Sequence, residues 1–339
     1  HQICPALPPA TIMLTHLQRR SAFCTNWSAT GTPFSSRDRL VRVHGVWPAP
    51  CLTPLAKPVL KQRGIQQVLP DLLVPLAGEY QFFNLFRYIT FRTGGATITA
   101  LLISLLCGPA MIRWLKGHQA EGQPIRADGP ESHLVTKIGT PTMGGLLILG
   151  AFALSTLLWM PLSNPYLWPV LSVALAFGAV GSVDDWMKLR RRSHHGMSGR
   201  MKLALQLLVA FAVTIVFVEL SPAQLRYGVA VPFLKDTLVP LGLMYVPFAM
   251  LVIVGASNAV NLTDGLDGLA IVPVMIVAAC FGLIAYLAGN VNFSSYLQIN
   301  YVPGTGDLAV MCGALLGAGL GFLWFNAPPA RVFICLLYT

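Results

Sequence analysis

The sequence has few charged residues. Only 11% of its 339 residues are Asp, Glu, Lys or Arg, whereas soluble domains contain about 25%. Hydrophobic residues make up 55% of the chain, and the mean hydropathy is +0.63. A soluble domain of this length needs more polar surface than these residues can supply, so the composition excludes that class and indicates a membrane protein.

Cysteine pairs with the spacing of a metal site are also missing. The seven cysteines are scattered, their number is odd, and no two are spaced as CxxC. This pattern predicts neither a disulfide framework nor a zinc site.

A basic surface of the kind that binds nucleic acid is missing as well. The net charge is +10, but eight Lys or Arg and one Asp give residues 1–67 a charge of +7 on their own. No basic stripe is interleaved with aromatic residues, so we expect no nucleic-acid partner. Residues 1–67 are rich in Pro, Ser and Thr and show neither a helical nor a strand period. We therefore expect this segment to be disordered or foreign to the mature protein, with a native start near Val68.

What the sequence does contain is a series of long apolar segments. Seven segments free of charge follow one another: 96–112, 142–160, 166–183, 203–218, 237–260, 268–289 and 308–325. About 20 apolar residues in a helix cross a hydrocarbon core roughly 30 Å thick. The sequence therefore predicts an all-α fold, a polytopic bundle of about seven transmembrane helices.

The charges between these segments predict the orientation of the bundle. The loops after the first and third segments carry ten Lys or Arg, whereas the loops after the second, fourth and sixth carry two. Basic loops stay in the cytoplasm, so we expect these two loops inside and the N-terminus outside.

This topology predicts that four polar motifs meet at the cytoplasmic face. They are the segments 137–145, 184–185, 258–268 and 325–329. Ionisable groups beside apolar spans are costly unless they face water, a partner or a metal. Their convergence from distant parts of the chain predicts a functional site.

Asp184 and Asp185 are the first candidates for chemistry. Adjacent carboxylates at the end of a span can serve a hard cation such as Mg²⁺ and act as a general base. The alternative is a water-facing helix end, with the basic residues 190–192 as counter-charge.

The other polar motifs also allow two interpretations each. Asp264 and Asp267 are three residues apart, so one helical turn would place both on one side, but an Asx/Gly turn between helices also needs such residues. Lys137, Thr140 and Thr142 could cradle a phosphate at a helix N-terminus. Alternatively, Thr140 is only a helix cap followed by proline.

Six segments in this order resemble one enzyme family. They are residues 86–92, 128–133, 139–145, 184–185, 258–268 and 325–329. From about residue 68 to residue 333, the chain resembles the phospho-N-acetylmuramoyl-pentapeptide-transferases, which belong to the polyprenyl-phosphate N-acetylhexosamine-1-phosphate transferase superfamily.

The resemblance implies a reaction and a location. The family transfers phospho-N-acetylmuramoyl-pentapeptide from UDP-MurNAc-pentapeptide to undecaprenyl phosphate, which forms lipid I and UMP. This Mg²⁺-dependent step of peptidoglycan synthesis takes place at the cytoplasmic face of the bacterial inner membrane. By the resemblance, Asp184 deprotonates or orients the lipid phosphate, and Asp185 lies beside the metal. The resemblance also suggests a homodimer.

The resemblance further implies a set of substrate-binding residues. Lys137 and Thr142 match positions that contact the diphosphate and the uridine. Asn326 matches an amide of the cleft, and Phe333 matches an aromatic residue that stacks on uracil. The loop on the nucleotide side is matched by Asn261, Asp264 and Asp267.

The chain departs from the family pattern at both ends. Residues 1–67 have no counterpart in the family. After Phe333 the family continues with a metal-binding Asp and a triple-His loop, whereas this sequence reads Ile-Cys-Leu-Leu-Tyr-Thr over residues 334–339. These departures suggest an incomplete transferase domain over residues 68–333, with about seven of the family's ten spans, and an inactive chain.

Two other functions compete with this interpretation. A transporter would place acids and helix breaks at mid-span, but the apolar segments here contain no charge. A transferase of the same superfamily that uses another sugar nucleotide is the nearer alternative.

Overall fold

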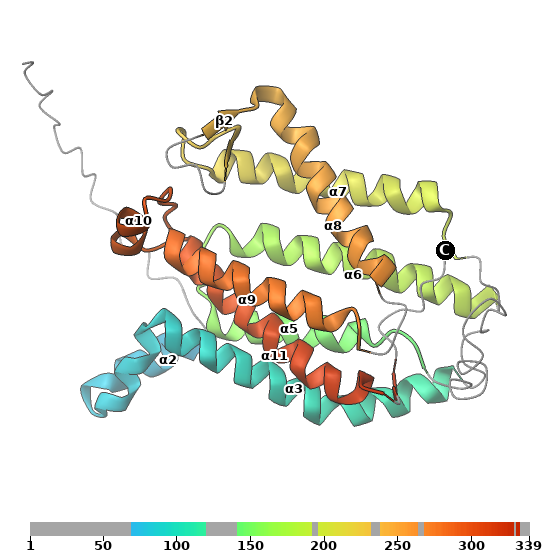
Figure 1. Ribbon diagram of the computed structural model, residues 1–339. Coiled ribbons are helices and arrows are strands. Elements are labelled where there is room, and N and C mark those ends of the chain that lie inside the picture. The colour runs from blue at the N-terminus through green and yellow to red at the C-terminus, as the bar shows by residue number, and fades with distance from the viewer. Residues whose placement is uncertain are drawn as a thin grey trace, which may run out of the picture. The chain divides into compact units, whose positions relative to one another are not determined.

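The structure is a computed structural model that describes residues 69–119, 141–191, 196–231, 238–263, 268–328 and 330–332 (Figure 1). These residues are mostly helical, and all belong to one compact unit, Lys61–Thr339. The long helices are α3 (Ile89–His118), α5 (Gly145–Trp159), α6 (Leu167–Arg191), α7 (Gly199–Leu220), α8 (Tyr245–Thr263), α9 (Ile271–Ala288) and α11 (Leu308–Asn326). The short helices are α2 (Leu69–Leu73), η1 (Val74–Gly78), η2 (Gln81–Arg87), η3 (Gly242–Met244), α10 (Val291–Leu297) and η4 (Thr305–Asp307).

Six helical segments in these ranges are long and apolar enough to cross a membrane. The chain is therefore a multi-pass membrane protein, as the sequence predicts. The seventh expected span, α5, has only 15 residues. It starts late because Met143 has a φ of 72° and turns the chain before Gly145. It ends at Trp159 because Met160, which precedes a proline, is extended, as such residues usually are.

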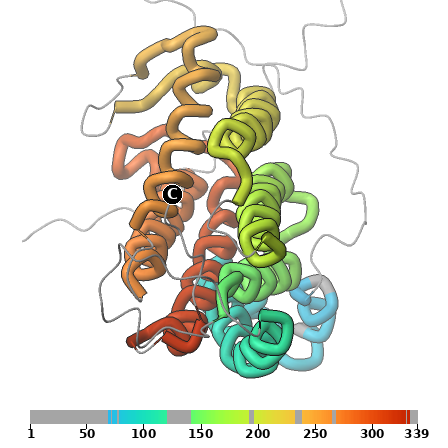
Figure 2. The backbone as a smooth tube through the Cα atoms, turned by 90° about the vertical axis from the view of Figure 1, so that its right-hand side faces the viewer, coloured from blue at the N-terminus to red at the C-terminus, as the bar shows by residue number. Residues whose placement is uncertain are grey.

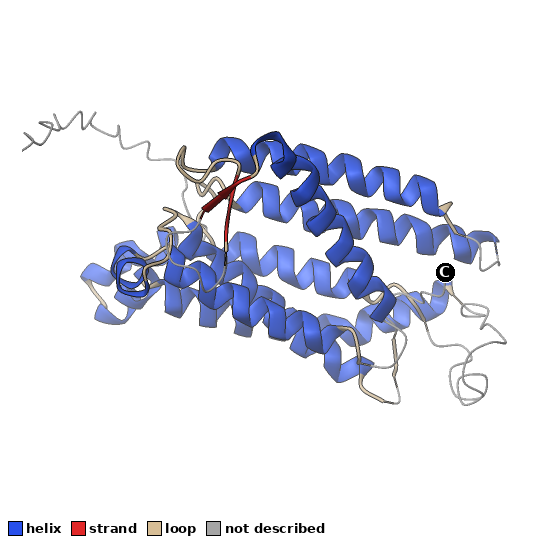
Figure 3. Ribbon diagram, turned by 45° about the horizontal axis from the view of Figure 1, so that its top comes forward, coloured by secondary structure: helices blue, strands red, loops and turns tan. Residues whose placement is uncertain are grey.

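The apolar segment 237–260 was expected to be one span, and that prediction is wrong at its start. Residues 238–240 form the strand β2 (Leu238–Pro240), which pairs antiparallel with β1 (Gly228–Ala230) (Figure 3). Val229 lies opposite Val239 in this two-stranded sheet. A short apolar run fits a strand as well as a helix, so the pattern could not distinguish them.

Helix α11 is the centre of the bundle. It lies between α3, α5 and α9 in both views (Figures 1 and 2). In the most apolar 18 residues of its span 61% of the residues are buried, compared with 6% for the span that contains α8. Gly317 makes this packing close, since a Cβ there would overlap the Thr97 carbonyl of α3. Membrane helices commonly associate through such small residues.

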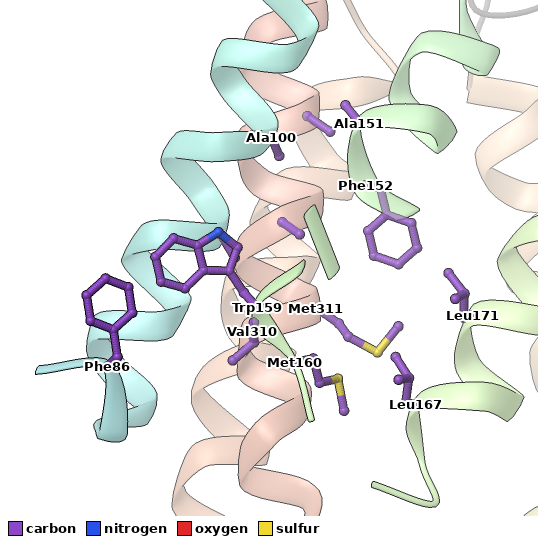
Figure 4. Close-up of a cluster of buried hydrophobic side chains, with 13 residues drawn as sticks. Phe86, Ala100, Ala151, Phe152, Trp159, Met160, Leu167, Leu171, Val310 and Met311 are labelled. Carbon is purple, nitrogen blue, oxygen red and sulfur yellow. The ribbon is translucent and has the colours of Figure 1, made fainter. Parts of the chain in front are cut away.

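Aromatic and hydroxyl side chains fix α5 against α3. Phe86 and Trp159 stack with ring centroids 5.6 Å apart (Figure 4). The Trp159 indole N–H donates to Thr99 Oγ1 at 3.0 Å, and Ser155 Oγ donates to the Ala96 carbonyl at 2.7 Å. Hydrogen bonds of this kind satisfy polar groups that water cannot reach.

A buried ion pair joins the starts of α3 and α11. Arg92 Nη2 donates to Asp307 Oδ1 at 2.9 Å. Asn164 Nδ2 donates to Asp307 Oδ2 at 3.1 Å and to the Gly304 carbonyl at 2.8 Å. The cluster ties the loop before α6 to both helices.

Consecutive long helices alternate in direction (Figure 1). The C-terminal ends of α3, α6, α8 and α11 therefore meet the N-terminal ends of α5, α7 and α9 at one end of the bundle. The β-hairpin and α10 lie at the opposite end (Figure 1). The ends that carry the polar motifs are thus brought together.

Candidate functional site

The carboxylates of Asp184 and Asp185 are buried near the C-terminus of α6, with exposures of 4% and 3%. Asp184 Oδ1 accepts a hydrogen bond of 2.7 Å from the backbone N–H of Met197. Asp184 Oδ2 lies 2.9 Å from Lys188 Nζ and 3.9 Å from Lys202 Nζ. The pair is therefore not a water-facing helix end, because protein donors surround it.

A pocket of about 160 Å³ opens beside Asp185, between α5, α6, α7 and α8. Its polar lining includes Asp185, Lys202, Gln206, Ser257 and Asn261. The structure thus brings together two residues from distant motifs, Asp185 and Asn261. Helix α7 adds the cation of Lys202 and the amide of Gln206. These groups suit a pocket for an anionic group.

The rest of the pocket lining is mostly apolar. Leu146 and Leu149 come from α5, and Phe177 comes from α6. At the pocket wall, Asn258 Nδ2 donates to Gln206 Oε1 at 2.9 Å and also to the Val254 carbonyl at 2.9 Å. This contact fixes Gln206 and joins α7 to α8.

Thr142 is completely buried, with 0% exposure. Its backbone N–H donates to Gln119 Oε1 at 2.9 Å, and its carbonyl accepts from Gln119 Nε2 at 3.3 Å. Its hydroxyl has no hydrogen-bond partner among the described residues. Thr142 therefore holds the turn into α5, while its neighbour Met143 lines the pocket.

Asn326 is also buried, with 2% exposure, and both ends of its amide are engaged. Its Oδ1 accepts from the Gly268 N–H at 2.9 Å, and its Nδ2 donates to the Val332 carbonyl at 2.9 Å. Gly268 has a φ of 73°, which favours glycine. Asn326 thus fixes Gly268, which directly follows Asp267.

Five residues singled out from the sequence lie outside the described residues. They are Lys137, Thr140, Asp264, Asp267 and Phe333.

Sequence reasoning did not single out the cations and amides around the aspartates. Lys188 follows Asp184 by four residues, a spacing that indicates a pair on one helix face. Lys202, Gln206 and Met197 come from beyond that helix, and no periodicity in the sequence connects them to Asp184 or Asp185. Only the packing of α6 against α7 does so.

Comparison with known proteins places the chain among enzymes. Residues 137–149 match the phospho-N-acetylmuramoyl-pentapeptide-transferase signature 1, and residues 167–335 match glycosyl transferase family 4. The phospho-N-acetylmuramoyl-pentapeptide-transferase of Granulibacter bethesdensis is 59% identical over 267 residues, which cover 79% of this chain and 74% of that protein. This chain belongs to the phospho-N-acetylmuramoyl-pentapeptide-transferase family.

The family membership confirms the resemblance inferred from the motifs. The alternative function as a transporter is therefore wrong. The signature of the phospho-N-acetylmuramoyl-pentapeptide-transferases ends within α5, and the broader match covers α6 to α11 with both buried aspartates. These matches do not support the expected inactivity of the chain.

Proposed function

We propose that this chain transfers phospho-N-acetylmuramoyl-pentapeptide from its uridine diphosphate carrier to undecaprenyl phosphate, forming lipid I and releasing UMP. One observation carries the proposal: Asp185, Lys202 and Asn261 line one pocket, directly beside the buried carboxylate of Asp184. A cation, an amide and two carboxylates at one end of a membrane bundle suit phosphoryl transfer between a lipid and a nucleotide.

In this reaction an oxygen of the lipid phosphate attacks the phosphorus that carries the sugar. A new phosphorus–oxygen bond forms, the bond between the two phosphates of the carrier breaks, and UMP leaves. Asp184 takes the proton of the lipid phosphate or orients that group. A carboxylate has about four lone-pair positions, and Met197 and Lys188 use two of them, which leaves capacity to accept a proton.

The pocket itself suits a phosphate-sized group. Its volume of about 160 Å³ is below the roughly 300–1,000 Å³ of sites for drug-sized ligands. Lys202 supplies a positive charge, and the amides of Asn261 and Gln206 supply hydrogen-bonding groups. The apolar part of the lining, which includes Phe177, borders the same pocket and suits the first part of the lipid chain.

The residues of the pocket fit a magnesium ion bound together with a diphosphate. The described residues contain no group of three or more His, Cys, Asp or Glu that could hold a metal alone. Mg²⁺, however, is usually held through one or two carboxylates and substrate phosphates. Asp185 would supply the carboxylate, with the oxygens of Ser257 and Asn261 nearby. When bound, the ion neutralises charge that develops during the transfer.

Other parts of the proposal rest on the resemblance. Lys137 and Thr142 match positions that contact the diphosphate and the uridine. Because Thr142 is fully buried, it acts on the substrate indirectly, through the turn into α5. Asn326 positions the nucleotide-side loop of Asp264 and Asp267, to which Asn261 also belongs. Phe333 stacks on uracil.

The location and assembly complete the proposal. The basic loops after the predicted first and third spans support a cytoplasmic location for the end of the bundle with Asp184 and Asp185. We place the protein in the bacterial inner membrane, as a homodimer.

The reaction is tested with the purified chain, undecaprenyl phosphate, Mg²⁺ and either UDP-MurNAc-pentapeptide or UDP-N-acetylglucosamine. We expect a lipid-linked product only with the muramoyl substrate. Product from the second nucleotide sugar alone would assign the chain to another transferase of the superfamily.

A further inference from the structure

The loop that enters α7 lies directly on Asp184. We call residues 196–198 the strap. The Met197 N–H of the strap donates to Asp184 Oδ1 at 2.7 Å. Ser198 Oγ accepts from the Met201 N–H at 3.4 Å and caps α7, so the strap is anchored at the start of that helix. Asp184 is thus held by its own helix on one side and by the strap on the other.

Gly196 is what lets the strap come this close. A Cβ at this position would overlap Asp184 Oδ1 and would lie 2.8 Å from Lys188 Cε. Asp184 has no room to move away, because it is 4% exposed and its other oxygen lies 2.9 Å from Lys188 Nζ. Three residues further on, Gly199 has nothing within 4 Å of the corresponding point.

We infer that Gly196 and the Met197 N–H are positioning elements for Asp184, a role that rests on the proposed function of this carboxylate. The strap and Lys188 together hold both carboxylate oxygens in one orientation. A general base acts only within hydrogen-bond reach of the proton that it takes. A misplacement of about 1 Å can lower a rate by roughly 10², so a side chain at position 196 affects the chemical step rather than substrate binding.

The test compares Gly196→Ala with Gly199→Ala in the full chain. We expect Gly196→Ala to lower kcat by about 10- to 100-fold, with KM for both substrates within about twofold of the unmodified chain. Gly199→Ala changes neither value by more than about twofold, because its new methyl group meets open space. The thermal unfolding temperature and the fraction of active protein are measured for both variants. An equal loss of kcat in both variants, or a change of KM alone, would overturn the positioning role.

Asp184→Asn, measured in parallel, separates this inference from the proposed function. If Asp184→Asn is inactive while Gly196→Ala keeps its rate, only the positioning role is lost. If Asp184→Asn keeps its rate, the proposed role of Asp184 is lost and the positioning role with it.

A second measurement does not depend on activity. Hydrogen–deuterium exchange of the peptide containing Met197 is compared between the unmodified chain and Asp184→Ala. Loss of the acceptor frees the amide, so we expect exchange at Met197 to become at least about tenfold faster. Unchanged exchange would show that the contact does not hold the strap.

Discussion

The ion pair between Arg92 and Asp307 gives a sharp prediction about stability. Arg92 is 5% exposed, and its Nε and Nη1 atoms find no acceptor among the described residues. Its charge is therefore compensated mainly by Asp307, 2.9 Å from Nη2. Removal of one partner from a buried pair costs about 3–5 kcal/mol. Because the Asp307 side chain is 19% exposed, we expect Asp307→Asn to lower the free energy of unfolding by about 3 kcal/mol, at the lower end of that range.

A surface pair provides the matched control. Arg226 and Glu219 lie 3.5 Å apart, and their side chains are 36% and 67% exposed. Exposed pairs contribute about 0.2–1 kcal/mol, so Glu219→Gln should have little effect. Titration of the purified protein from mild detergent into dodecyl sulfate, followed by circular dichroism, measures both variants. The two unfolding constants should differ by roughly 30-fold, which corresponds to about 2 kcal/mol. Equal values for the two variants would refute the assignment of Arg92 as a buried charge that depends on Asp307.

Three further predictions follow from the site and the topology. Asn326→Ala removes both hydrogen bonds of a buried amide and should lower the free energy of unfolding by about 1–3 kcal/mol. Asn292→Ala, in the exposed part of α10, should leave that free energy unchanged. Equal effects of the two variants would contradict the bridging role of Asn326. Asn261→Ala should raise KM for the nucleotide sugar more than it lowers kcat in steady-state kinetics, since Asn261 lines the proposed substrate pocket. An unchanged KM would show that Asn261 does not bind this substrate. In a cysteine-free background, a cysteine at Arg191 should be labelled from the cytoplasmic side and one at Gln298 from the other; the reverse pattern would overturn the predicted orientation.

The sequence predicts the helices well because a membrane leaves few choices. Every backbone group must be satisfied within a spanning segment, so long apolar runs become helices. The prediction fails where an apolar run is not a span. Residues 238–240 pair with residues 228–230 instead, and Gly242, with a φ of 54°, follows the strand before α8 begins. Hydropathy carries no information about this pairing.

The site was only partly predictable. The topology brings the ends of α6 and α8 together, and Asp185 and Asn261 do share a pocket. The roles of individual polar residues were not visible, because an amide or hydroxyl can serve a substrate or a turn with equal chemistry. Asn326 was expected in a cleft, but both ends of its amide form hydrogen bonds with backbone groups. Its partners depend on how the end of α11 packs, which no spacing in the sequence reveals.

Lipid I formation by the purified chain tests the central claim most directly. The chain, its Asp184→Asn variant and its Glu219→Gln variant are incubated with undecaprenyl phosphate, UDP-MurNAc-pentapeptide and Mg²⁺, and product is measured against a control without enzyme. Loss of general-base catalysis lowers turnover by about 10² or more. We therefore expect lipid I from the unmodified chain and from Glu219→Gln, and at least about 100-fold less from Asp184→Asn. No product from the unmodified chain, or more than half of its rate in Asp184→Asn, would contradict the assignment.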